Sequence, residues 1–282
     1  MRLRILSLTI LAALAAVALP QFAARRASLG TVARAAQDDK QEKRKRYDDD
    51  AEFTERDEFR QSYTLAPGAQ VRLSGLNGSV DVETSAGSAA EVYVVRSART
   101  REDLDYHKVV VEQTASGLVV RGERDNDHGW RGERHDVRQR VWVKIPRSVE
   151  LTASGINGRA TVGEIDGAVH LSGINGAVEV ARARGYTDID GVNGRVTMTI
   201  ADLGERGVRV SGVNGHVELR FADAVNADLS VSGVNGAVNA DLPGVTMIGN
   251  ATRTNFRARV GAGGTPITVS GVNGSVRLAP RG

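Results

Sequence analysis

The sequence contains no cysteine, so the folded chain can hold no disulfide. For the same reason no cysteine follows the N-terminal segment to carry a lipid anchor. The stability of the fold must therefore come from packing and hydrogen bonding.

Aromatic residues are also scarce, at 4% of the chain, and basic residues are interspersed with acidic ones although the net charge is +3. A nucleic-acid surface needs a basic patch, and single-strand binding also needs aromatic side chains. Four basic residues at 43–46 form such a run, but three aspartates follow at 48–50. The composition therefore argues against nucleic acid as a partner.

A sustained helical period is missing as well, because no stretch after residue 60 repeats its apolar residues at helical spacing over several turns. Glycine is abundant, with 32 residues, which suits many tight turns and few long helices. Short segments of alternating apolar and polar residues dominate instead, and they predict an all-β fold.

The N-terminus has the pattern of an export signal, in which Arg2 and Arg4 precede an apolar stretch from Ile5 to Leu19. This stretch is near the lower length for a membrane span, so an uncleaved anchor that holds the chain at the membrane stays open as the alternative. Residues 1–36 are assigned to this signal or anchor, and residues 37–58 to a flexible charged linker. Export without disulfides predicts the periplasm or surface of a bacterium.

A five-residue phrase, Ser/Asp-Gly-x-Asn-Gly with a branched apolar x, occurs seven times after residue 73. Asn and Gly readily adopt positive φ, so the pair is typical of a sharp corner. From Asn157 on, the phrase returns after 18, 18, 21, 21 and 38 residues, and Asn255 divides the last interval into 20 and 18. The predicted structural turn residues are Asn77, Gly78, Asn157, Gly158, Asn175, Gly176, Asn193, Gly194, Asn214, Gly215, Asn235, Gly236, Asn273 and Gly274.

Two architectures fit this repeat. If each Asn–Gly pair closed a hairpin, the chain would form a long antiparallel meander that needs a second layer to cover it. We favour a single-stranded parallel β-solenoid, similar to a β-helix, with coils of 18–21 residues, because the two short strands of each coil face each other and close a core. Stacked coils would place successive asparagines about 4.8 Å apart, within reach of an amide hydrogen-bond ladder.

The residues before this repeat run, 59–151, are expected to form a β-sheet region that caps or continues the solenoid at 152–282. Thr114 to Gly117 are expected to close a hairpin, and 121–140, which lacks an apolar period, to form a long exposed loop. Four segments are predicted strands: 91–97, 107–113, 117–123 and 140–146.

The sequence yields no catalytic, cofactor-binding or metal-ligating residue. His128 and His135 share the charged loop with several carboxylates, but their spacing matches no known ligand pattern. In the repeats, residues at equal offsets from the Asn would stack into outer rows, and no row concentrates the paired carboxylates of an acid–base site. Two such rows are Thr152, His170, Asp188, Arg209, Ser230 and Thr268, and Thr161, Glu179, Thr197, Glu218, Asn239 and Arg277.

Three stretches resemble the bacterial "putative adhesin" family, a domain-of-unknown-function group of exported, repeat-built β-proteins. They are VRLSGLNGSVDVET at 71–84, VWVKIPRSVELTASGINGRATV at 141–162, and the run of phrases that continues to the C-terminus. The resemblance covers roughly residues 60–282 and implies a β-solenoid of the cell envelope without a catalytic residue. The charged loop at 121–140 and the missing glycine after Asn255 depart from the pattern.

Three functions follow as hypotheses. The main one is a non-enzymatic, exported envelope protein, adhesin-like or a scaffold, that binds an envelope polymer or protein. The second is an accessory protein of envelope-stress signalling, tethered by its N-terminus. The third is a polysaccharide-active enzyme of the β-helix type, which would need a carboxylate-lined cleft.

Overall fold

The computed structural model describes residues 53–124, 136–200, 203, 205–222, 225–249, 252 and 254–281. The chain divides into two compact units, Met1–Phe53 and Thr54–Gly282, and only the second is described below. The predicted signal or anchor and residues 37–52 of the predicted linker lie outside the described residues. The end of the linker was predicted wrongly, because Glu55–Glu58 belong to a strand. Within the described residues, none of the helices has the length and apolar character that crossing a membrane requires.

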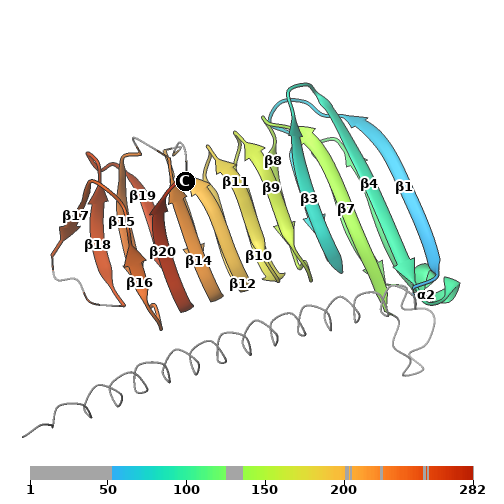
Figure 1. Ribbon diagram of the computed structural model, residues 1–282. Helices are drawn as coiled ribbons and strands as arrows, with labels where there is room; N and C mark the ends of the chain where they lie inside the picture. The colour runs from blue at the N-terminus through green and yellow to red at the C-terminus, as the bar shows by residue number, and fades with distance from the viewer. Residues whose placement is uncertain are drawn as a thin grey trace, which may run out of the picture. The chain divides into compact units, whose positions relative to one another are not determined.

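The all-β prediction is confirmed, because the described residues form twenty strands in a single hydrogen-bonded sheet that nearly closes on itself (Figure 1). One short helix, α2, is the helical element of this part of the chain. The N-terminal elements are β1 (Glu55–Thr64), β2 (Gln70–Ser74), β3 (Gly78–Ser85), β4 (Ala89–Ala98), α2 (Arg101–Tyr106), β5 (His107–Thr114), β6 (Gly117–Arg124), β7 (Val137–Pro146), β8 (Glu150–Ser154) and β9 (Ala160–Ile165).

The C-terminal elements contain most of the repeated phrases. One of them, β12, runs through the phrase without a break, so the Asn–Gly pair there does not end the strand. These elements are β10 (Val169–Asn175), β11 (Val178–Ala183), β12 (Thr187–Ile200), β13 (Val208–Ser211), β14 (Asn214–Phe221), β15 (Ala227–Ser232), β16 (Val238–Ala240), β17 (Val245–Ile248), β18 (Phe256–Val260), β19 (Thr265–Ser270) and β20 (Asn273–Pro280).

Parallel pairing joins equivalent segments of successive repeats in two ladders. The first ladder runs β2–β8–β10–β12–β13–β19–β15, and the second runs β7–β3–β9–β11–β12–β14–β20–β16. Side chains alternate between the two faces of each strand, so residues at equal positions in the repeat form columns. Val178, Val196, Val217 and Val276 are one such column, and all four are buried. The buried columns of both ladders meet in one hydrophobic core.

The sheet is mixed, and this corrects the prediction of a parallel β-solenoid at 152–282, where β15 pairs antiparallel with β18 and β18 with β17. Antiparallel pairing dominates at both ends: β1–β4 and β4–β7 with β5–β6 at the N-terminal end, and β15–β18 with β18–β17 at the C-terminal end. The physical reason is that the sequence departs from the repeat in these segments. Consecutive strands joined directly to each other pair antiparallel, as β5–β6 and β17–β18 do, and the pairs β1–β4, β4–β7 and β15–β18 join strands that are not consecutive in the chain.

The N-terminal β-region contains the four predicted strands, and the hairpin at Thr114–Gly117 is confirmed by the antiparallel pairing of β5 with β6. The predicted loop at 121–140 is too long, because β6 extends to Arg124 and β7 begins at Val137. Residues 125–135, with His128 and His135, lie outside the described residues. Arg138 and Arg140 alternate with Val137, Gln139 and Val141, which already carried the period of a strand.

Helix α2 was missed by the sequence analysis, although a signal for it is present. Thr100 caps the helix by accepting a hydrogen bond from the Asp103 amide, and the Asp103 side chain accepts one from the Thr100 amide. This reciprocal arrangement is a capping box, readable in the sequence as Thr-x-x-Asp. Leu104 of α2 is buried with Ala98 and Val137 in a second, small apolar cluster.

The spatial order of the last repeats differs from their order in the chain. The final segment, β19 and β20, lies between β13–β14 and β15–β16, so the last two full repeats exchange places. The prediction that Asn255 begins a further parallel coil is wrong, because β18 pairs antiparallel with β15 and Asn255 accepts a hydrogen bond from the Gly233 amide. The hairpin of β17 and β18 occupies one side of β15 and leaves the other side to β19.

Candidate functional site

The seven asparagines of the repeated phrase lie in one hydrogen-bonded row on the surface. Asn157, Asn175, Asn193 and Asn214 each donate from Nδ2 to the Oδ1 of the preceding asparagine, at 2.9, 3.1, 3.2 and 3.2 Å. The row then follows the spatial order of the strands, from Asn273 to Asn214 at 3.2 Å and from Asn235 to Asn273 at 3.3 Å. The first acceptor is Asn77, whose own Nδ2 donates to the Val137 carbonyl.

Positive φ falls on the two glycines of each phrase. The first glycine lies in the left-handed region, as Gly191 does at φ +64, and the glycine after Asn lies near φ +150, as Gly194 does at +152. A Cβ on Gly194 would lie 1.9 Å from the carbonyl oxygen of Gly176 in the neighbouring repeat. The backbones of adjacent repeats therefore approach too closely at this corner for any side chain.

The two predicted outer rows are also brought together by the register. In the first ladder Thr152, His170, Asp188, Arg209, Thr268 and Ser230 follow one another across neighbouring strands. His170 Nδ1 lies 3.9 Å from Asp188 Oδ2, so a histidine faces the one carboxylate of this row. In the second ladder the order is Thr161, Glu179, Thr197, Glu218, Arg277 and Asn239. Neither row places two carboxylates side by side, as an acid–base pair would require.

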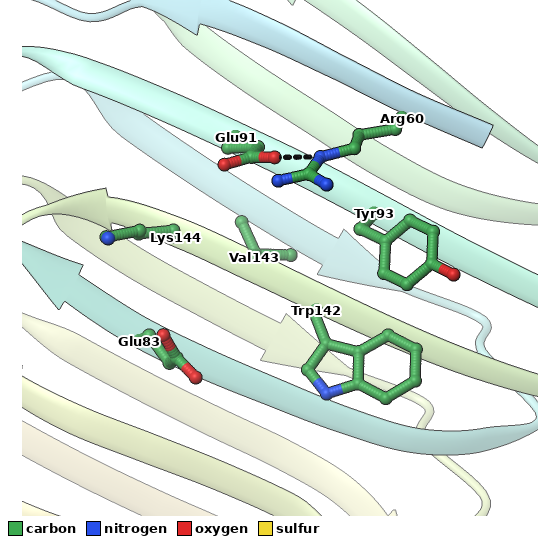
Figure 2. Close-up of a pocket in the computed structure, with 7 residues that line it drawn as sticks. All are labelled: Arg60, Glu83, Glu91, Tyr93, Trp142, Val143 and Lys144. Carbon is green, nitrogen blue, oxygen red and sulfur yellow. Dashed lines mark hydrogen bonds and ion pairs between the residues drawn. The ribbon is translucent and has the colours of Figure 1, made fainter.

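The most distinctive surface lies on β1, β4, β7 and β3, where a row of side chains crosses four strands (Figure 2). The register places Arg60 opposite Tyr93, Tyr93 opposite Trp142, and Trp142 opposite Asp81. The row two residues away continues with Glu91, Lys144 and Glu83. We call Arg60, Glu83, Glu91, Tyr93, Trp142 and Lys144 the aromatic surface.

The alternation of the strands turns these aromatic side chains outward. Tyr93 lies between Val92 and Val94, which are buried, and Trp142 lies between Val141 and Val143, which are buried too. Successive residues of a strand point to opposite faces, so both rings are left half-buried on the outer face. The segments VYV and VWV therefore indicated exposed aromatic residues. In a strand with one buried face the residue between two buried valines points outward and is usually polar, and here it is aromatic.

The two rings form a rigid platform. Their centroids are 5.2 Å apart and their planes make an angle of 23°, which is a stacked arrangement (Figure 2). The Arg60 guanidinium carbon lies 6.0 Å from the centre of the Tyr93 ring, and the Tyr93 hydroxyl donates to Glu58 Oε2 at 2.9 Å. Contacts with Trp142, Arg60 and Glu58 thus hold the Tyr93 ring in place, so a ligand that stacks on the ring pair meets a preformed surface.

Charged groups border the platform. Arg60 Nε donates a hydrogen bond to Glu91 Oε1. This bond, assisted by the charges of Arg60 and Lys144, lowers the pKa of the Glu91 carboxyl below its ordinary value. The same bond raises the pKa of the Arg60 guanidinium. The platform is therefore flanked by the ion pair of the Glu91 carboxylate and the Arg60 guanidinium.

The aromatic surface has the chemistry of a binding site. It forms a shallow depression of about 280 Å³, near the lower limit of ligand pockets, with Val143 at its floor. An aromatic face can stack on another flat or apolar ring face, and the carboxylates and cations beside it can accept and donate hydrogen bonds. A general acid would need a carboxyl with a raised pKa, and the pKa of Glu91 is lowered.

Metal binding finds no support in the part of the chain that the structure describes. Within the described ranges no group of three or more His, Asp or Glu side chains lies close enough together to hold a metal ion. Tyr93, Trp142 and the charged groups around them were not predicted from the sequence, because none belongs to the repeated phrase.

Comparisons with known proteins give only remote likenesses. No protein-family model matches the chain, so the resemblance to the adhesin family stays a prediction. No curated protein matches either. Among solved structures, a putative cell adhesion protein from Clostridium sporogenes has a TM-score of 0.40 and 9% identity, covering 80% of this chain and 100% of that one.

Two further solved structures are similar to a lesser degree. A putative adhesin from Bacteroides fragilis has a TM-score of 0.32 at 10% identity, over 79% of this chain and 97% of that one. A putative lipid binding protein from Parabacteroides distasonis has a TM-score of 0.25 at 11% identity, over 80% and 97% of the two chains. These scores are too low to establish a common fold or a common function.

Proposed function

We propose that this chain is a non-enzymatic, exported protein of the bacterial cell envelope, and that its aromatic surface binds a polysaccharide. The stacked and half-exposed pair of Tyr93 and Trp142 carries this proposal. Aromatic side chains make up only 4% of the chain, and two of them lie on the outer face, where they do not contribute to the hydrophobic core. Pyranose rings have apolar faces that stack on such a platform and hydroxyls that bond to carboxylates and cations beside it.

The fold supports an extended ligand. We propose that the repeats wind as a parallel β-solenoid, in which each coil adds one rung to a long face. The row that begins with Tyr93 and Trp142 continues across neighbouring strands with Asp81 and then with Thr161, Glu179 and Thr197. Rungs about 4.8 Å apart offer hydroxyl and carboxylate groups at a spacing that successive units of a polymer can follow.

The location follows from the N-terminal sequence. The pattern of Arg2, Arg4 and the apolar stretch after them favours export, and the absence of cysteine agrees with a chain that folds outside the cytoplasm without disulfides. An uncleaved segment would hold the binding surface at the membrane, and a cleaved one would release it into the periplasm or onto the cell surface.

The test is co-sedimentation of the purified chain with insoluble peptidoglycan and with isolated surface polysaccharide. We expect retention on at least one polymer, and Trp142→Ala should weaken it at least about tenfold, as removal of a central aromatic anchor does. Tyr186→Ala is the matched control, because Tyr186 is a half-exposed aromatic with Arg206 at 4.8 Å from its ring but lies directly before β12, at the start of its pairing with β10 in the first ladder. Absence of retention on both polymers, or equal loss in the two variants, would refute the proposal.

A further inference from the structure

The two ends of the sheet differ in how their edge strands are protected. At the N-terminal end the edge strands are β1, which carries five charged residues among its ten, and β5, which carries Lys108 and Glu112, and α2 packs beside β1, β4 and β5 (Figure 1). Charged side chains and covering elements are the usual means by which a sheet edge avoids pairing with another chain. The buried Leu104 anchors α2 to the sheet, and the capping box stabilises the N-terminus of the helix, so α2 is a stable cover of this end.

The C-terminal end has no comparable protection among the described residues. Here the edge strands are β16, with the sequence VNA, and β17, with the sequence VTMI, and neither contains a charged residue. β17 pairs only with β18, and β16 only with β20, so each leaves one row of backbone groups unpaired within the described part of the chain.

Apolar side chains occupy both faces of β17. Register with β18 places Val245 opposite Val260 and Met247 opposite Ala258, and both partners are buried, so Val245 and Met247 extend the core-facing layer. Ile248 points to the other face. Met247 and Ile248 are nonetheless 47% and 43% exposed, and Phe59 on β1 is the third large apolar side chain with such exposure in the described residues.

A strand that is apolar on both faces is typical of a position inside a sheet rather than at its edge. The protein element that fits such an edge is a β-strand, because a strand pairs with the free backbone groups along the whole length of the edge. A second copy of this chain supplies such a strand, because it contains β17 as well. Two charged edge strands of the same sign would repel each other, and β17 has no charged residue, so two copies of β17 can pair without that repulsion.

We propose that two copies of this protein associate head to head, by antiparallel pairing of β17 with β17 of the second copy about a two-fold axis. The pairing centred on Met247 sets Thr246 opposite Ile248 of the other copy and keeps Val245 and Met247 on the same side as their counterparts. The core-facing layers of the two copies then join, whereas a register shift by one residue would keep them apart. Such a dimer carries its two aromatic surfaces toward opposite ends of the assembly, and it does not depend on the proposed function.

The test is the mass of the purified chain in solution as a function of concentration, by sedimentation or light scattering. We expect a two-fold increase over the mass of one chain as concentration rises. Met247→Lys should weaken association at least tenfold, because it sets two like charges across the axis. Phe59→Lys, an equally exposed apolar residue at the protected end, is the control and should leave association unchanged.

Single-cysteine variants test the register, since the natural chain has no cysteine to compete. Met247→Cys should form an intermolecular disulfide on mild oxidation, because directly opposed side chains bring their Cβ atoms within reach of one. Ser62→Cys on β1 should not. A single-chain mass at every concentration, a dimer indifferent to Met247→Lys, or crosslinking through position 62 instead of 247 would each overturn the proposal.

Discussion

Asn157 donates a hydrogen bond from its side-chain amide to the side-chain oxygen of Asn77, at 2.9 Å, although 80 residues separate the two in the chain. The same bond recurs along the row at 18- and 21-residue separations, so each interior asparagine both donates and accepts. Two asparagines 80 residues apart thus make the same hydrogen bond as two asparagines 18 residues apart, because every one of them occupies the same corner of its repeat.

Removing an interior member of this row should cost more stability than removing its end. Asn193→Ala deletes two bonds, one to Asn175 and one from Asn214, whereas Asn235→Ala deletes only the bond to Asn273. At about 0.5–1 kcal/mol for each exposed bond, we expect a loss of roughly 1–2 kcal/mol for the interior change and about half of that at the end. Urea unfolding measures both, and equal losses would contradict a contribution that grows with the number of amide bonds removed.

Gly194→Ala should destabilise the fold severely. The added Cβ would lie 1.9 Å from a backbone oxygen of the neighbouring repeat, and φ of +152° already disfavours a side chain. We expect a loss above about 3 kcal/mol, or failure to fold. Gly68→Ala is the matched control, because Gly68 also has positive φ, +78°, but no atom within 4 Å of the added Cβ. It should cost only about 1–2 kcal/mol, and similar losses in the two variants would contradict the close approach.

Substitutions at Tyr93 should separate stacking from hydrogen bonding in polysaccharide retention. Tyr93→Phe removes the hydroxyl that donates to Glu58 and keeps the ring on Trp142, so retention should fall less than about threefold. Tyr93→Ala removes the ring itself, and retention should fall about tenfold or more. Co-sedimentation at several polymer concentrations distinguishes the two, and a larger loss for Phe than for Ala would refute a stacking platform.

Acid should weaken the fold through Glu91 and Glu218. Hydrogen bonds from Arg60 and from Arg220 lower the pKa of these carboxyls, so the unfolded chain takes up their protons first as the pH falls. Their contribution is therefore complete above the ordinary Glu pKa, near 4.5, and is lost as the pH drops through the lowered folded values.

The change should be small, since both groups lie at the surface where solvent screens them. Melting temperature against pH, between neutrality and strong acid, measures it. Glu218→Gln should show a shallower decline than the natural chain on the acid side and the same behaviour near pH 7 apart from a constant offset. A steeper decline in the variant would mean that the folded chain does not lower the pKa of Glu218.

Several features of the fold could be predicted from sequence because they depend on local pattern. The valine-rich segments 91–97 and 107–113 predicted strands, and the Thr114–Gly117 turn predicted the β5–β6 hairpin. The prediction of parallel pairing was wrong at β17 and β18, where the sequence departs from the repeat. The turn glycines around β17 and β18 permit a hairpin, and no local signal distinguishes a hairpin that pairs with β15 from one more parallel coil.

The candidate site was less predictable than the fold. Tyr93 and Trp142 lie in separate strands 49 positions apart, and only the antiparallel register of β4 with β7 brings them together. Their aromatic identity at outward positions was visible in the sequence. Their contact was not, because it depends on which strand pairs with which and in what register.

The sequence by itself determined the class of fold and the spacing of its repeats, because apolar alternation and Asn-Gly corners act within a few residues of the chain. The tertiary structure alone decided the order of the last repeats and the assembly of the aromatic surface. Every repeat offers nearly the same hydrogen-bonding edge to every other, so the pattern permits many orders of stacking. The pairing of β18 with β15, on the side that β19 leaves free, selects one of them.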